Sequence, residues 1–161
     1  MSHAVLQNRV VQTVVVQKEV FDATEQYDRL LQECPGAAVV TFTGYVRDHC
    51  DTGGVGQLEL EHYPGMTESV LEALGQRAKQ RFNLKAWRII HRYGVLDVNE
   101  PIVWTAVIAD HRSAAFDACQ FLMDSLKTDA PFWKREHMTD GSSNWVLAKS
   151  SDSERRKRWQ E

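Results

Sequence analysis

The sequence predicts a mixed α+β fold, and two observations lead to this class. Runs rich in β-branched residues, such as "VVQTVVVQ" (10–17) and "VVTF" (39–42), predict strands. Apolar residues at helical spacing predict about three helices between such runs. The resulting order, β-α-β-β-α-β-β-α-β, groups strands into blocks instead of strict βαβ units, which favours a single α+β domain with a mixed sheet.

The first part of the chain predicts a strand, a helix and a second strand. After the strand at 10–17 comes "FDATEQYDRLLQEC" (21–34), a helix in which Asp22 and Glu25 form a capping-box pair. "PGAAVVTFTGYVRD" (35–48) begins with a turn and continues as a buried strand. "HCDTGGVGQ" (49–57) is rich in glycine and holds little that packs, so we expect a mobile loop there.

The middle of the chain predicts three more strands and two helices. "LELEHY" (58–63) alternates apolar and polar residues, the pattern of a half-buried strand, and a helix follows at about 67–81. "AWRIIHRYGVLDV" (86–98) and "PIVWTAVIAD" (101–110) predict two further strands. The third helix is expected at about 113–126.

The end of the chain is expected to be less regular. Pro131 stops any continuation of the third helix, and "NWVLA" (144–148) predicts a short closing strand. We expect the domain to occupy residues 1–150 and residues 151–161 to form a charged, flexible tail. The "RRKR" run in that tail is a solvated segment or a nucleic-acid patch, and the acidic balance of the chain favours the first.

Composition narrows the class of protein. The 161 residues include 43% hydrophobic and 25% charged residues, which is typical of one soluble domain. The net charge of −3 argues against nucleic-acid binding by the whole surface. Three scattered cysteines without a C-x-x-C motif fit a reducing compartment. Neither a membrane span nor a signal core is visible, so we expect a cytoplasmic protein that does not bind membranes.

A set of cations near predicted element ends indicates an anion site. His111 and Arg112 lie where a strand ends and a helix begins, and the N-terminus of a helix attracts anions. The other members are Arg47, Lys127, Lys134 and Arg135, and none has an acidic partner at the i,i+4 spacing that would mark a surface ion pair within a helix. A lysine crowded by cations in a partly apolar pocket has a lowered pKa and becomes usable as an acid, base or nucleophile. The residues alone thus predict a pocket for a small anionic, phosphorylated ligand, with solvated surface charges as the alternative.

Motifs for other kinds of catalytic or binding site find little support in the sequence. The sequence has no dinucleotide-binding, phosphate-loop, zinc-protease or nucleophile-elbow motif. His49, Cys50 and Asp51 are three neighbours in one loop and cannot converge easily on a metal ion, and Cys119 lies on the apolar stripe of a helix. We therefore expect neither a metal nor a cofactor.

Five segments carry a resemblance to a known family. They are "VVTFTGYVRDH" (39–49), "LEHYPGMTE" (60–68), "IIHRYGVL" (89–96), "HRSAAFDACQFLMDSLKTDAPFWKRE" (111–136) and the tryptophan of "NWV". Together they resemble the large, catalytic subunit of molybdopterin synthase. The resemblance spans roughly 37–149, and the 111–136 block is long enough to be specific.

The resemblance implies a fold, an activity and partners. The implied fold is the α/β hammerhead type. Two large subunits would form a homodimer, and a small ubiquitin-like subunit bound to each would give a heterotetramer. The small subunit would carry sulfur as a thiocarboxylate on its C-terminal Gly-Gly. The large subunit, a sulfurtransferase, would convert cyclic pyranopterin monophosphate (precursor Z) into molybdopterin by adding two sulfurs, a step of molybdenum cofactor biosynthesis.

The resemblance also implies roles for individual residues. Lys127 matches a catalytic lysine with an acid/base role, and Lys134 matches a second important lysine that positions the thiocarboxylate or the substrate. The implied substrate-binding set is Arg47, His111, Arg112, Phe42, Met123, Arg135, Glu136 and Lys149. Lys149 stands where we expect an arginine that reaches into the neighbouring subunit's site, and lysine lacks the bidentate fork of arginine.

Two alternatives of other classes stay open on the sequence. A non-catalytic module would bind the tail of a ubiquitin-like protein without forming product. A basic-tailed nucleic-acid binder would show affinity that falls steeply with salt.

Overall fold

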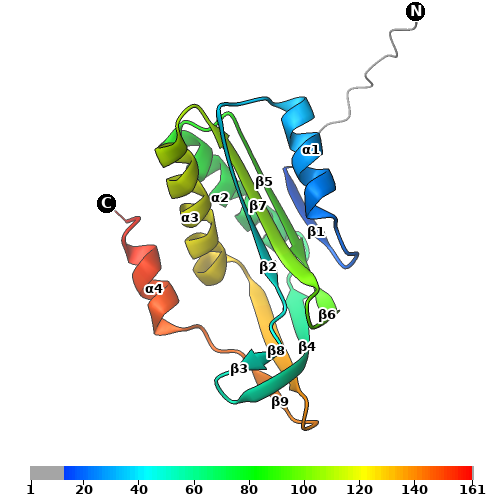
Figure 1. Ribbon diagram of the computed structural model, residues 1–161. Helices are drawn as coiled ribbons and strands as arrows, with labels where there is room; N and C mark the ends of the chain where they lie inside the picture. The colour runs from blue at the N-terminus through cyan, green and yellow to red at the C-terminus, as the bar shows by residue number, and fades with distance from the viewer. Residues whose placement is uncertain (1–12, 161) are drawn as a thin grey trace, which may run out of the picture.

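A computed structural model describes residues 13–160 (Figure 1). Its helices and strands are β1 (Val14–Gln17), α1 (Ala23–Glu33), β2 (Ala38–Tyr45), β3 (His49–Cys50), β4 (Gly53–His62), α2 (Met66–Phe82), β5 (Ala86–Arg92), β6 (Gly94–Asp97), β7 (Pro101–Ala109), α3 (Arg112–Asp129), β8 (Phe132–Met138), β9 (Ser143–Trp145) and α4 (Ser150–Lys157). The mixed α+β class is confirmed, with four helices where about three were expected. Of the strand expected at 10–17, residues 14–17 form β1 and residues 10–12 lie outside the described residues.

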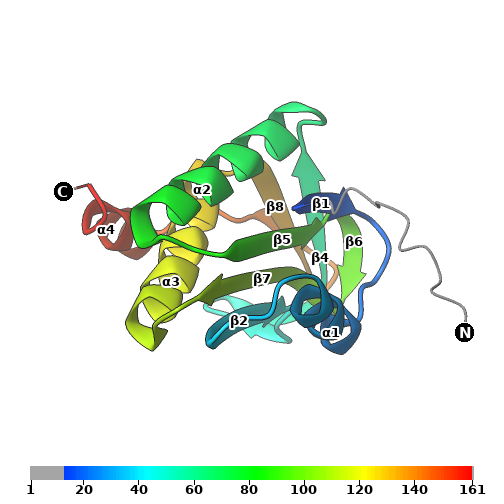
Figure 2. The same ribbon diagram turned by 90° about the horizontal axis from the view of Figure 1, so that it is seen from above.

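A four-stranded sheet in the order β1-β5-β7-β2 forms the centre of the fold. β1 runs parallel to β5, and β7 is antiparallel to both of its neighbours. Helix α1 covers one face of this sheet, and α2 and α3 cover the other (Figure 2). Because both faces are covered, β7 is buried along 103–109 and its sequence is a nearly continuous apolar run.

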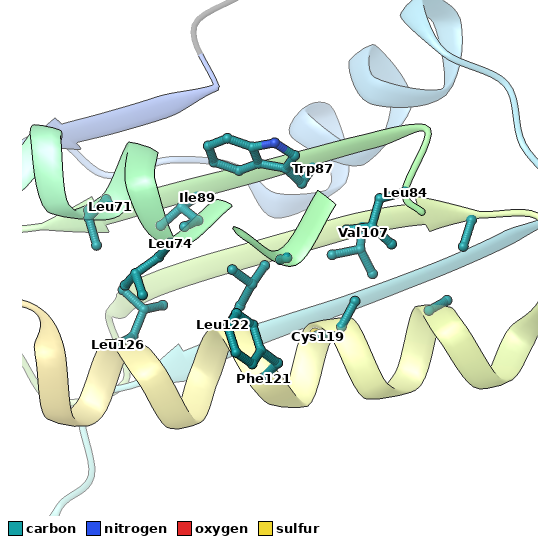
Figure 3. Packing of buried hydrophobic residues seen from close by; sticks show 14 of the residues in the cluster. Leu71, Leu74, Leu84, Trp87, Ile89, Val107, Cys119, Phe121, Leu122 and Leu126 are labelled. Carbon is teal, nitrogen blue, oxygen red and sulfur yellow. The ribbon is translucent and has the colours of Figure 1, made fainter. Parts of the chain in front are cut away.

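The main hydrophobic core lies between this sheet and helices α2 and α3 (Figure 3). Leu71 and Leu74 of α2 and Leu122 of α3 are fully buried, and they share one cluster with Ile89 and Val107 of the sheet. Full burial of a side chain of this size contributes about 1.5–3 kcal/mol relative to exposure. This core therefore holds α3 firmly against the sheet.

A second sheet, built on β4, extends from one end of the central sheet (Figure 1). β4 pairs antiparallel with β6 on one side and with β8 on the other, while β3 and β9 complete the sheet. The expected mobile loop at 49–57 is wrong for most of its length, because β4 already begins at Gly53. Val55, which is buried, donates a backbone hydrogen bond to the carbonyl of Asp48 at 2.8 Å and holds the hairpin closed.

The chain after α3 differs most from expectation. No strand was predicted at 132–138, but this segment forms β8 and pairs with β4 along its length. The tail expected to be flexible instead forms helix α4 over 150–157. The closing strand expected at 144–148 is reduced to β9, which ends at Trp145. None of the helices within residues 13–160 is long and apolar enough to cross a membrane.

One glycine of α2 allows the core to close. A Cβ built on Gly75 would lie 2.1 Å from the ring of Trp87, a buried residue of β5 (Figure 3 shows the ring). Gly75→Ala gains about 1 kcal/mol of helix propensity. The clash with a rigid buried ring outweighs this gain, because overpacking of a core costs about 1–3 kcal/mol or more.

We therefore expect Gly75→Ala to lower the free energy of unfolding, as measured by urea denaturation. Ala73→Gly, on the exposed side of the same helix, is the matched control, since it reports the propensity contribution without any ring contact. A Gly75→Ala protein as stable as the wild type would contradict the packing described for Trp87.

Candidate functional site

The junction between α3 and β8 brings two of the predicted lysines together. Lys127 lies in the last turn of α3, which ends at Asp129, and Pro131 starts the return of the chain as β8. Burial lowers the pKa of the Lys134 ammonium below its ordinary value, and the positive charge of Lys127 lowers it further. The two amines are thus close enough for their charges to interact.

Arg47 joins these lysines from the end of β2. Its positive charge also lowers the pKa of Lys134. The preceding residue, Val46, is buried, and its backbone exchanges two hydrogen bonds of 2.9 Å with Asn99 and Glu100. These bonds fix the segment that carries Arg47, whose own side chain is exposed.

An aromatic and imidazole wall backs Lys134. The ring of His91 stacks on Phe132 with centroids 3.8 Å apart, and His62 lies against both Phe132 and Tyr93. Burial lowers the pKa of His91 to about 3, and the charge of Lys134 contributes to this shift. His91 is therefore neutral, and its Nδ1–H donates to the carbonyl of Arg92 at 2.8 Å.

No residue of this wall was predicted from the sequence as a site residue. A histidine inside an apolar strand run is usually a satisfied core residue, so "IIHRY" carried no signal of a site. Only the pairing of β8 with β4 and the position of β5 bring these rings together.

Alternation along β8 separates the residues that were expected to act together. Lys134 and Glu136 point to one face of the strand, and Arg135 points to the other. There Arg135 donates to the Glu59 carboxylate at 2.7 and 3.0 Å and lies 5.0 Å from the centre of the Trp145 ring. The structure therefore places Arg135 away from Lys134, in an ion pair that holds β8 to β4.

Two apolar residues of the expected pocket wall belong to neighbouring elements. Met123 lies one turn before Lys127 on α3 and packs partly against the main core. Phe42 of β2 is 42% exposed and lies opposite Thr105, whose hydroxyl contacts the Cys119 thiol of α3 at 3.5 Å. Since residues opposite each other share a face, Phe42 lies on the α3 side of the sheet.

His111 and Arg112 lie at the opposite end of α3 from the lysines. The fifteen residue steps from Arg112 to Lys127 correspond to about 22 Å of helix. Both side chains are exposed, and His111 makes no side-chain cap to the helix. One copy of the chain therefore does not unite these two residues with Lys127 and Lys134.

Two of the predicted lysines lie close to carboxylates that come from distant segments of the chain. Asp152 of α4 lies 3.9 Å from the Lys127 ammonium, and Asp51 lies 3.6 Å from that of Lys149. The Asp152 carboxylate also raises the pKa of Lys134, against the larger lowering effects. Spacing along one helix could not predict these pairs, because their members lie on different elements.

The arrangement can bind an anion and exchange a proton. Arg47, Lys127 and Lys134 provide three positive charges, and burial lowers the pKa of the Lys134 amine. Within residues 13–160, no group of three histidine, cysteine or acidic side chains is placed to hold a metal ion. Lysine and arginine side chains in this arrangement supply acid–base and electrostatic chemistry.

Comparison with known proteins gives the family. A family model described as MoaE protein matches residues 16–129. The chain is 45% identical over 151 residues to a molybdopterin synthase catalytic subunit from Brucella melitensis, covering 92% of this chain and 91% of that protein. It is 47% identical over 147 residues to one from Pseudomonas aeruginosa, covering 91% and 97%.

A solved structure shares the fold as well as the sequence. The molybdopterin biosynthesis MoaE protein from Burkholderia ambifaria matches with a TM-score of 0.79 at 41% identity, over 94% of this chain and 99% of that one. Sequence and fold agree over most of the chain, so the chain belongs to the MoaE family.

Proposed function

We propose that this chain is the catalytic subunit of a molybdopterin synthase, acting in the cytoplasm. In the proposed reaction, cyclic pyranopterin monophosphate receives two sulfurs and becomes molybdopterin. The sulfur arrives as a thiocarboxylate on the C-terminal Gly-Gly of a small ubiquitin-like subunit. Family membership and the names of relatives at 45–47% identity support this assignment.

The observation that carries the proposal is the crowding of Lys134. Its amine is half-buried against His91 and Phe132 and is repelled by Lys127 and Arg47, so it releases a proton more readily than an ordinary lysine. A lower pKa brings an amine closer to the range in which it both accepts and donates protons efficiently. The same cations attract the thiocarboxylate and the substrate phosphate, both of which are anions.

Lys127 and Lys134 have different roles in the proposed reaction. The resemblance assigns the acid/base role to Lys127, but burial favours Lys134 for proton transfer. Lys127 is 48% exposed beside the junction, where its ammonium can bind the incoming anionic group in place of Asp152. Glu136 shares a strand face with Lys134, and Met123 contributes apolar wall, so both stay in the proposed site.

A second copy of the chain completes the site in this proposal. His111 and Arg112 are exposed at the N-terminus of α3, a place suited to phosphate, but about 22 Å of helix separates them from Lys127. Phe116, one turn further along α3, is 63% exposed, and Phe42 and Tyr45 of β2 are also exposed. Burial of these aromatics between two copies would place His111 and Arg112 of one copy beside the lysines of the other, as the homodimer implied by the resemblance requires. Lys149 stays a proposed contributor across the same interface.

A single-turnover assay tests the catalytic role. The protein is mixed with thiocarboxylated small subunit and cyclic pyranopterin monophosphate, and molybdopterin is quantified. We expect Lys134→Ala to reduce the rate of product formation by about a hundredfold or more, because general acid–base catalysis contributes about 10²–10⁴-fold. Lys127→Ala should also reduce the rate, because it removes the charge that binds the incoming anionic group. Arg135→Ala, on the opposite face of β8, is the control and should retain turnover in the fraction that folds. Tight binding of the small subunit by the intact protein without any product would contradict the proposal and leave a binding module.

Mixing of inactive variants tests the contribution of the second copy. His111→Ala and Lys127→Ala are each expected to be impaired, but mixed dimers contain one intact site. A random equimolar mixture should therefore recover about a quarter of wild-type activity, as C2 symmetry requires. The control mixture, His111→Ala with Arg112→Ala, should recover nothing, because every site then lacks one residue. Absence of recovery in the first mixture would mean that one chain supplies all these residues.

A further inference from the structure

Helix α4 turns a single stripe of side chains toward α3. Among residues 151–160 only Asp152, Arg156 and Trp159 are half-buried, and the others are exposed. Their i, i+4, i+7 spacing puts them on one side of the helix. Figure 1 shows α4 lying beside α3, with its N-terminal end toward β8.

Trp159 anchors the C-terminal end of this helix. Its ring packs edge-on against Phe82 and Phe121 at 5.8 and 5.6 Å between centroids. Its indole N–H donates to the buried Asp124 carboxylate at 2.8 Å, and Arg158 pairs with the same carboxylate at 3.1 Å. The "RRKRW" segment is thus an attachment to α3.

Arginine side chains bridge the seam where α4 and Trp159 lie against α2 and α3. Arg156 donates to Asp129 at 3.1 and 3.2 Å, and Arg81 of α2 donates to the backbone carbonyl of Trp159 at 2.5 Å. A cavity of about 410 Å³ lies along this seam, lined by Arg77, Gln80, Arg81, Phe121, Arg156 and Trp159. Because the guanidinium groups around it already have acceptors on α3 and at Trp159, we interpret the cavity as part of the anchor.

The N-terminal end of α4 places the Asp152 carboxylate beside Lys127 and Lys134. Asp152 is 17% exposed, and its carboxylate lies 3.9 Å from the Lys127 ammonium. The negative charge of Asp152 also raises the pKa of Lys134. The negative charge of Asp152 thus lies where the proposed function requires a negative charge of the ligand.

We propose that α4 is a displaceable strap, which covers Lys127 and Lys134 in the free chain and leaves when the C-terminal carboxylate of the small subunit enters. This inference rests on the proposed function, which supplies the anionic ligand. Like charges cannot share the site without repulsion, so the ligand and Asp152 compete for the two lysines. Displacement is feasible because α4 contains no buried residue and is held mainly by Trp159 and by ion pairs.

Limited trypsin digestion reports the position of the strap directly. Cleavage sites at Arg155, Arg156, Lys157 and Arg158 lie in or just after α4, and docking should protect them, because proteolysis follows the population of the open form. We expect saturating small subunit, in its carboxylate form, to accelerate release of the tail as followed by mass spectrometry. Trp159→Ala should accelerate release without the small subunit, and the small subunit should then add little.

Affinity for the small subunit gives the second readout. Asp152→Asn removes the competing charge and should tighten binding about two- to fivefold, the range for one exposed charge pair. Glu154→Gln, the same charge change on the exposed side of α4, is the matched control and should leave affinity unchanged. Slower or unchanged cleavage on binding, or weaker binding by Asp152→Asn, would overturn the strap while leaving the proposed function intact. Failure of every variant to bind the small subunit would overturn both.

Discussion

The site depends on holding the half-buried amine of Lys134 beside two other cations. Three like charges at close range repel one another, and partial burial weakens the screening by water. The arrangement persists because its parts are fixed independently. The apolar core holds α3 and therefore Lys127, the pairing of β4 with β8 holds Lys134, and the buried Val46 holds the segment of Arg47. The two sheets thus hold three positive charges near one another, and the repulsion lowers the pKa of the Lys134 amine.

The same junction explains the division of roles along β8. Because side chains alternate, one face presents Lys134 and Glu136 to the site, while the other uses Arg135 and His137 to bind Glu59. The carboxylate of Glu59, whose pKa is lowered by these two partners, ties β8 to β4. Neighbouring residues in "WKRE" therefore serve two different purposes, one catalytic in the proposed function and one structural.

The sequence predicted the elements whose stability is local or apolar, and missed those that depend on distant partners. β2 and β7 are β-branched runs, and α3 carries an apolar stripe that Pro131 terminates, so all three were predicted. β8 was missed because "FWKREHM" has no β-branched residue and owes its conformation to β4. α4 was missed because its attachment depends on Asp124 and Asp129, far away in the sequence. For the same reason the ion pairs of Lys127 and Arg135 were invisible, as was the wall formed by His62, His91 and Tyr93.

The measurement that tests the central claim most directly is an NMR titration of the lysine side chains, with ¹³C at Cε and assignment by single lysine substitutions. Lys134 should lose its proton below the ordinary lysine value of 10.5 as the pH rises. Lys127→Ala should move this titration to higher pH by removing a positive charge, and Asp152→Asn should move it to lower pH by removing a negative one. A Lys134 that titrates at the ordinary value and does not respond to Lys127→Ala would contradict the account, because the two amines would then not share a site.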